Sequence, residues 1–108
     1  MTERSEKHRD CLLTLVFPAS LEETIVEHLL DHEEWAASFS AVRVEGHGHA
    51  LSLRDPAEQV RGRSRRLMVQ IAINGDDATR LVEHFRDTLP NPEIVYWRVP
   101  LSDYGRFS

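Results

Sequence analysis

Two histidines alternate with two glycines at residues 46–49, and this short motif has the clearest potential for chemistry in the chain. Gly46, His47, Gly48 and His49 follow one another directly. Alternate side chains of an extended strand project to the same side about 7 Å apart, so His47 and His49 could bind one transition-metal ion. Glycine has no Cβ atom and lets a ligand approach the backbone, which suits an anionic ligand instead. The alternative interpretation is a strand-end turn that carries two solvent-exposed histidines.

A second pair of histidines lies at positions 28 and 32, with acidic residues beside it. His28 and His32 are four residues apart in a segment of helical periodicity, so they share one helix face. With Glu27 and Asp31 nearby, the pair forms a second candidate set of ligands for a divalent cation. The alternative is that both histidines simply lie at the margin of an apolar helix stripe.

Four arginines are crowded between positions 61 and 66, namely Arg61, Arg63, Arg65 and Arg66. Guanidinium groups can hold phosphate or carboxylate groups through paired hydrogen bonds. A nucleic acid is not the expected partner, because the isoelectric point is near 5.6 and no aromatic residues are interleaved with the arginines. We expect Arg63 and Arg65 to join the glycine–histidine motif in a ligand site; the alternative is a solvated arginine face.

The single cysteine, Cys11, argues against two kinds of site. One cysteine excludes an internal disulfide and a cysteine-based zinc cluster, and it favours a reduced, cytoplasmic setting. At the start of an expected central strand, cysteine is more often a small buried apolar residue than a ligand. No motif pairs Cys11 or a serine with a histidine for nucleophilic catalysis, so we do not predict an enzyme.

The composition is that of one small globular domain. The chain has 108 residues, of which 41% are hydrophobic and 29% charged, and its formal net charge is -5. This apolar fraction can fill one modest core, so we expect a flexible N-terminal segment at residues 1–10 and a single domain at residues 11–108. No run approaches the roughly twenty apolar residues of a membrane span, and the polar start is unlike a secretory signal, so no membrane insertion is expected.

The expected elements follow the order strand, helix, strand, strand, helix, strand. The strands are predicted at residues 11–17, 41–45, 65–73 and 93–99, and the helices at residues 21–34 and between Asn74 and Pro90. Ser20 and Glu23 form a capping box that should start the first helix. Residues 50–62 hold a proline and a glycine with weak periodicity, which predicts a long excursion with one helical turn at residues 57–60.

This order is the split β-α-β arrangement of the ferredoxin-like α+β fold, βαββαβ. Right-handed crossovers place the first and third strands at the centre of a four-stranded antiparallel sheet, with both helices on one face. The other face should be polar in a monomer, but the first and fourth strands are apolar on both faces. The residues expected on this second face are Leu12, Thr14, Val16, Val95, Trp97 and Val99. We therefore expect a homo-oligomer packed sheet to sheet.

Five short motifs occur in an order and spacing that are specific as a set. They are Cys11 to Leu15, Gly46-His47-Gly48, Glu58-Gln59-Val60, Gly62 to Arg66 and Tyr96-Trp97. Together, over roughly Cys11 to Arg106, they resemble PII signal proteins. The match is closer to a small bacterial family of PII-like proteins with no assigned activity, whose genes tend to lie beside heavy-metal efflux pumps. The resemblance implies a non-enzymatic subunit, usually a trimer, that binds a small ligand between subunits and contacts a membrane transporter.

The connection before the fourth strand departs from the nucleotide-binding PII proteins. Those proteins carry a loop with glycine and lysine that holds phosphates, whereas this chain reads Leu89-Pro90-Asn91-Pro92-Glu93. The two prolines donate no amide hydrogen bond. The usual PII mode of ATP binding is therefore not expected, and a divalent transition metal is the candidate cofactor.

Three functional hypotheses follow from these features. The first is a PII-like regulatory or sensor protein that binds a small ligand at inter-subunit clefts beside residues 46–49. Such a protein would be linked to heavy-metal efflux or tolerance and would engage a metal-efflux transporter through residues 50–62. The second is a metal-binding protein that uses His47 and His49. The third is a small cofactor-free ferredoxin-like enzyme with a buried histidine and Trp97, which requires a closed apolar cavity between helices and sheet.

Overall fold

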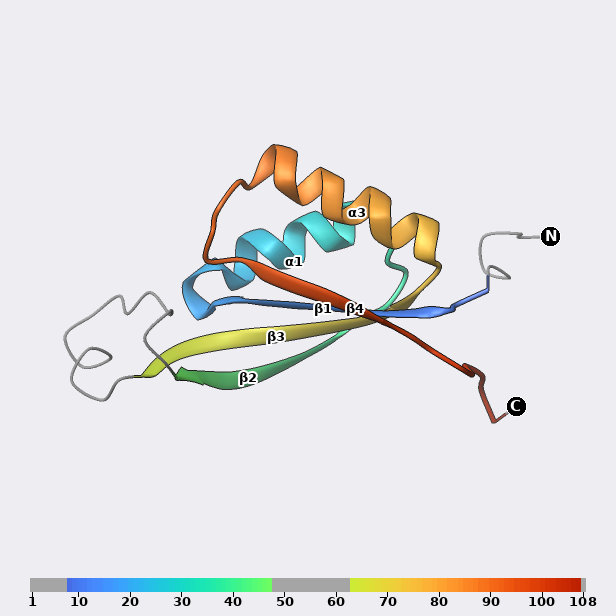
Figure 1. The fold of residues 1–108 in the computed structure, drawn as a ribbon. Coiled ribbons are helices and arrows are strands. Elements are labelled where there is room, and N and C mark those ends of the chain that lie inside the picture. The colour runs from blue at the N-terminus through green and yellow to red at the C-terminus, as the bar shows by residue number, and fades with distance from the viewer. Residues whose placement is uncertain (1–7, 48–62, 108) are drawn as a thin grey trace.

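The computed structural model describes residues 8–47 and 63–107 and has the expected βαββαβ order (Figure 1). Its elements are β1 (Cys11–Pro18), η2 (Ala19–Leu21), α1 (Glu22–Asp31), β2 (Ser40–His47), β3 (Arg63–Ile73), α3 (Gly75–Thr88) and β4 (Val95–Pro100). The predicted excursion at residues 50–62, with its helical turn, lies outside the described residues. Across the two described segments, neither helix has the length and apolar character needed to span a membrane.

The four strands form one antiparallel sheet in the order β2-β3-β1-β4. The central position of β1 and β3 is the one that right-handed crossovers require. Leu15, in the middle of β1, lies opposite Val69 of β3 on one side and Tyr96 of β4 on the other. Both helices lie over the same face of the sheet, and within residues 8–47 and 63–107 no helix covers the opposite face (Figure 1). The predicted ferredoxin-like fold is confirmed.

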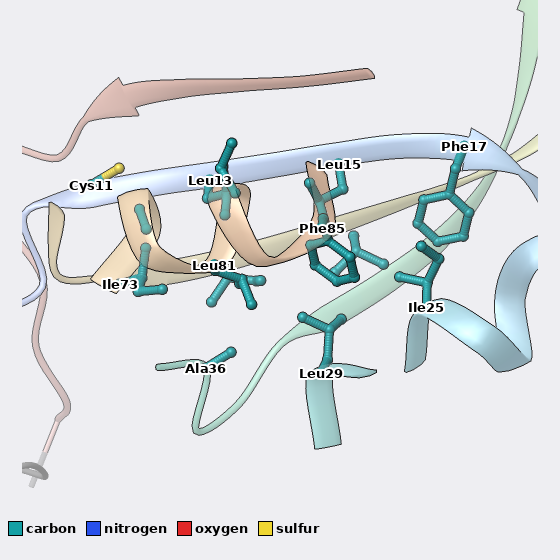
Figure 2. Packing of buried hydrophobic residues seen from close by; sticks show 14 of the residues in the cluster. Cys11, Leu13, Leu15, Phe17, Ile25, Leu29, Ala36, Ile73, Leu81 and Phe85 are labelled. Carbon is teal, nitrogen blue, oxygen red and sulfur yellow. The ribbon is translucent and has the colours of Figure 1, made fainter. Parts of the chain in front are cut away.

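The core lies between the two helices and the sheet face that they cover (Figure 2). Alternation along β1 directs Cys11, Leu13, Leu15 and Phe17 into it, because every second side chain of a strand points to the same face. The helices and β3 complete it with Ile25, Leu29, Leu67, Val69, Ile71, Ile73, Ala78, Leu81, Val82 and Phe85. The core therefore fixes which side of each strand is left for solvent or for a partner.

The start of α1 differs from the predicted capping box, and that prediction is wrong. Ser20 lies inside the short 3-10 helix η2, and Leu21 takes the N-cap position without a side-chain hydrogen bond. The 3-10 turn supplies the Ala19 carbonyl to the amide of Glu22, so the first accepting carbonyl lies one residue earlier than a capping box at Ser20 requires. The helix also ends at Asp31, three residues before the predicted end.

The first turn of α3 has the capped start that its turn residues predicted. The side chain of Asn74 accepts a hydrogen bond from the amide of Asp76 at 3.0 Å and donates one to the carbonyl of His8 at 3.0 Å. The amide of Gly75 donates to the carboxylate of Asp10 at 2.9 Å. A helix start leaves several amides unpaired, and these contacts satisfy two of them while holding residues 8–10 against α3.

The helix-free face of the sheet, here called the open face, is apolar along both edge strands. The register places on it Leu12, Thr14 and Val16 of β1, Val42 of β2, Met68 and Gln70 of β3, and Val95, Trp97 and Val99 of β4. The edge residues Val42, Val95, Trp97 and Val99 are between 44% and 49% exposed in the single subunit. The predicted apolar residues of β1 and β4 on this face are confirmed, with Thr14 as the one polar residue among them. On the helix-covered face, β4 carries Tyr96 and Arg98, so the prediction that both faces of β4 are apolar is only partly right.

Candidate functional site

The pairing of β2 with β3 brings together four of the six residues predicted to bind a ligand. The register pairs Gly46 with Ser64, His47 with Arg63, and Glu45 with Arg65. The other two predicted residues, Gly48 and His49, lie outside the described residues. The ligand site therefore stays a prediction, and so does the metal pair of His47 and His49.

The side chains of Glu45, His47 and Arg65 lie on the helix-covered face of the sheet. The Nε2 atom of His47 is 3.7 Å from a carboxylate oxygen of Glu45, and both side chains are exposed. Arg65 is exposed at the position opposite Glu45. Such an exposed ion pair contributes at most about 1 kcal/mol to stability. An imidazole, a carboxylate and a guanidinium at one sheet end can also contact a polar ligand.

Arg66, in contrast, is a buried cation on the opposite face of the sheet. It is 4% exposed, and its Nε atom donates to the hydroxyl of Ser64 at 2.8 Å. Its Nη1 atom donates to the carbonyl of Glu93 at 3.4 Å. Consecutive strand residues project to opposite faces, so Arg65 and Arg66 cannot hold one ligand from the same face. Arg66 links the start of β3 to the α3–β4 connection.

The α3–β4 connection forms one wall of a pocket of about 480 Å³. Its apolar walls include Phe85, Leu89 and Ile94, and no residue of α1 lines it. Three polar side chains also line it, those of Arg86, Asn91 and Tyr96. Arg86 donates to the hydroxyl of Tyr96 at 3.0 Å, and its guanidinium lies 5.5 Å from the centre of the Tyr96 ring. The pocket therefore offers an apolar surface with one cationic group, beside α3 and β4 rather than between both helices and the sheet.

A cluster of three histidines bridges α1 and α3, and sequence reasoning predicted only two of its members. His28 Nδ1 lies 3.0 Å from His84 Nε2. The ring of His32 lies 4.2 Å from that of His84, centre to centre, and is stacked on Trp35 at 4.7 Å. Its Nδ1 atom is 3.2 Å from a carboxylate oxygen of Glu34. The shared face of His28 and His32 is as expected, and His84 joins it from α3.

The carboxylate beside this histidine cluster is not one that the sequence suggested. Glu34, rather than Glu27 or Asp31, contacts His32, because α1 ends at Asp31 and the following turn brings Glu34 back toward the helix end. Among residues 8–47 and 63–107, no three His, Cys, Asp or Glu side chains are already arranged to hold a metal ion.

The pKa of His84 is lowered from its ordinary value of 6.5. Burial is the main cause, and the neighbouring His32 and His28 lower the pKa further, while Asp87 and Glu34 act weakly in the opposite direction. His84 is therefore mostly neutral at pH 7. In its pair with His28, one imidazole nitrogen donates a hydrogen and the other accepts it.

Cys11 lies far along the sheet from the predicted ligand site. It is buried and pairs with Ile73 at one end of β3, whereas His47 pairs with Arg63 at the other end. The prediction that Cys11 is a core residue is confirmed. Within one subunit, Cys11 and His47 cannot bind the same metal ion.

Comparison with known proteins assigns the chain to a family. A family model described as "Protein of unknown function (DUF3240)" matches residues 7–108. No protein with curated annotation matches the chain. Among solved structures, a DUF3240 family protein from Shewanella baltica OS155 has a TM-score of 0.73 and 18% identity, over 94% of this chain and 100% of that one.

Two other solved structures share the fold. The nitrogen regulatory PII-like protein CPII from Thiomonas intermedia K12, solved with ADP, AMP and bicarbonate, has a TM-score of 0.66 and 17% identity over 90% of this chain and 93% of that one. CutA1 from Pyrococcus horikoshii has a TM-score of 0.63 and 12% identity, over 90% and 88% respectively. At these identities the likeness shows the fold alone. The chain belongs to the DUF3240 family of unknown function, and its fold is the PII-like form of the ferredoxin-like fold.

Proposed function

We propose that this protein is a non-enzymatic, cytoplasmic PII-like regulatory or sensor subunit that binds a small ligand at clefts between subunits. The observation that carries the proposal is the open face, which combines a PII-like sheet with exposed apolar side chains on both edge strands. Apolar patches of this kind mark interaction surfaces in small proteins. A homo-oligomer, with a trimer as the resemblance to PII-like proteins implies, would cover them.

The energetics of the open face support self-association. Fully burying a large apolar side chain contributes about 1.5–3 kcal/mol, and Val95, Trp97 and Val99 are each about half exposed in the single subunit. Burying the polar residues of this face against a second copy should cost little, because Gln70 already donates a hydrogen bond to Thr14 at 3.4 Å within the subunit. Two such faces can therefore pack together without leaving this pair unsatisfied.

The ligand class that we propose is a small anion, with a divalent metal ion as the second candidate. His47 and Arg65 lie on the helix-covered face at one end of the β2–β3 pair, and Arg66 adds a buried positive charge on the opposite face, where Gly46 also lies. CPII was solved with adenine nucleotides and bicarbonate, but two prolines in residues 89–93 of this chain remove amides that could hold phosphates. This favours a small anion over ATP bound in the usual PII mode.

The metal alternative is supported by one feature, the exposed imidazole of His47 beside the Glu45 carboxylate. His47 and His49 would be the protein ligands in that case. A membrane transporter for metal efflux is the partner that the resemblance implies, and its cytoplasmic face is where such a subunit would act.

Calorimetric titration tests the ligand site directly. Purified protein is titrated with bicarbonate, AMP, ADP, ATP, Zn²⁺, Ni²⁺, Co²⁺ and Cu²⁺, and compared with the double variant His47→Ala/His49→Ala. We expect the variant to keep its oligomeric state and to lose the ligand, since His47 is exposed at a strand end. The variant His8→Ala, which removes another exposed histidine, is the matched control. Unchanged affinity for every ligand found would remove this site from the proposal.

The pH dependence of the same titration separates the two ligand classes. An imidazole loses the lone pair that binds a metal when it is protonated. Metal affinity should therefore weaken on acidification, whereas the affinity for an anion held by charged histidines should increase.

A further inference from the structure

Two pairs within the cluster of three histidines between α1 and α3, both of which include His84, have ring separations close to those of imidazoles that share a metal ion. With a metal–nitrogen distance of about 2.05 Å, a ring centre lies about 3.2 Å from the metal, so two rings are about 4.5 Å apart at a right angle and about 5.2 Å apart at the tetrahedral angle. The ring centres of His28 and His84 are 5.2 Å apart, and those of His32 and His84 are 4.2 Å apart. The spacing of the helices therefore already suits coordination.

The nitrogen atoms themselves need only a rotation of the rings. In the structure, His28 and His84 point at each other through a 3.0 Å hydrogen bond, so in the described parts of the chain no three ligand side chains yet meet at one point. The χ2 torsion of histidine is broad, and rotation about it turns both nitrogens toward a common point beside the line that joins them.

His32 is oriented as metal-binding histidines commonly are. Its Nδ1 atom lies 3.2 Å from the Glu34 carboxylate, and an imidazole that donates this hydrogen presents its Nε2 lone pair to a metal. The ring is also stacked on Trp35 with an interplanar angle of 6°, which fixes its plane. A carboxylate that orients one imidazole is a recurrent feature of metal sites and is not needed for a simple contact between two helices.

The charge around the cluster suits a divalent cation. The carboxylates of Asp87 and Glu34 are close enough to His84 to favour positive charge there. Imidazole ligands suit copper, nickel and zinc, and Cu²⁺ binds tightest in the usual order of affinities.

We propose that His28, His32 and His84 form a binding site for a divalent first-row transition-metal ion, with Glu34 as the carboxylate that orients His32. This site lies between the helices and is separate from the proposed ligand cleft at residues 46–49. It goes beyond the proposed function, and neither proposal depends on the other.

The test uses the variant His47→Ala/His49→Ala as the reference protein, so that the other candidate metal site is removed. Ni²⁺ and Cu²⁺ are titrated into this reference protein and into three derivatives of it, and binding is measured by calorimetry or by competition with a chromophoric chelator. Two derivatives carry His28→Gln or His84→Gln, and the third carries the control substitution His8→Gln at an exposed histidine. We expect one metal ion per subunit in the reference and in the control, and at least tenfold weaker binding in both cluster variants. Absence of binding in the reference, or affinities unchanged by His28→Gln and His84→Gln, would overturn the proposal.

A spectroscopic measurement keeps the proposal testable if a cluster variant fails to fold. Copper bound to the reference protein is examined by electron paramagnetic resonance, in which coordinated imidazole nitrogens split the signal. We expect two or three such nitrogens. Coordination by a single nitrogen would contradict a site between the helices. So would NMR spectra in which added Ni²⁺ broadens other signals but not those of His28 and His84. If the variant His47→Ala/His49→Ala loses the small ligand of the proposed cleft but still binds metal between the helices, the two proposed sites are separate.

Discussion

Thr14 of β1 and Trp97 of the edge strand β4 lie directly opposite each other on the open face. Thr14 is 1% exposed, whereas Trp97 is 47% exposed. The hydroxyl of Thr14 already accepts a hydrogen bond from Gln70 on the neighbouring strand. The buried polar group is thus satisfied inside the subunit, and the exposed indole beside it is available to pack against a second copy.

Replacing Trp97 with aspartate should dissociate the oligomer without unfolding the subunit. A charge in the middle of an apolar interface would have to be desolvated without a partner, which is strongly unfavourable. Size-exclusion chromatography with light scattering measures the mass. Leu30→Asp is the matched control, because Leu30 is exposed on the helix side of the molecule and its charge should leave the mass unchanged. An intact oligomer in Trp97→Asp would place the interface elsewhere.

The lowered pKa of His84 predicts a specific loss of stability in acid for the metal-free protein. The folded state holds this proton less tightly than the unfolded state, in which the pKa is near 6.5. The contribution of His84 is therefore fully present above pH 6.5, decreases as the pH falls below it, and levels off below the pKa of the folded state. Urea unfolding in the presence of a chelator, at pH 7.5 and pH 5.5, measures the change.

The variant His84→Gln should show a smaller loss of stability between these two pH values than the wild type. Glutamine keeps a polar side chain of similar size but does not titrate. Equal losses in the two proteins would mean that other groups cause the acid sensitivity.

Two neighbouring leucines of α1 provide a direct test of the core. Leu29 is fully buried, whereas Leu30 is 61% exposed. Leu29→Ala should lower the free energy of unfolding by about 2–5 kcal/mol, because it removes buried methyl groups and leaves a cavity. Leu30→Ala should change the free energy of unfolding by less than about 0.5 kcal/mol when the single subunit is measured. Similar effects of the two substitutions, measured by urea unfolding, would contradict the observed orientation of α1.

The strand order and the core were predictable because they depend on local patterns. The alternation of Leu13, Leu15 and Phe17 with their neighbours defines the two faces of β1 from the chain alone, and the structure has the same assignment. The capping box failed for a local reason as well, since the 3-10 turn after Pro18 competes with it. Patterns of hydrophobicity do not distinguish these two ways of starting a helix.

The site residues were less predictable because their contacts join distant segments. His84 meets His28 across 56 residues of sequence, and only the packing of α3 against α1 brings them together. A weak signal existed, since His84 directly precedes the core residue Phe85 in α3. Likewise, strand alternation predicts that Arg66 faces away from Arg65, but its burial depends on the carbonyl of Glu93, 27 residues away.

Native mass spectrometry of the purified chain tests the central claim most directly, because one spectrum shows both the number of subunits and any bound ligand. The subunit mass is 12.5 kDa, and spectra are recorded with and without the anions and metal ions named above. We predict a homo-oligomer, a trimer by resemblance, that gains mass on addition of a small ligand. A monomer of 12.5 kDa that gains no mass with any of them would contradict the proposal of a ligand-binding PII-like oligomer.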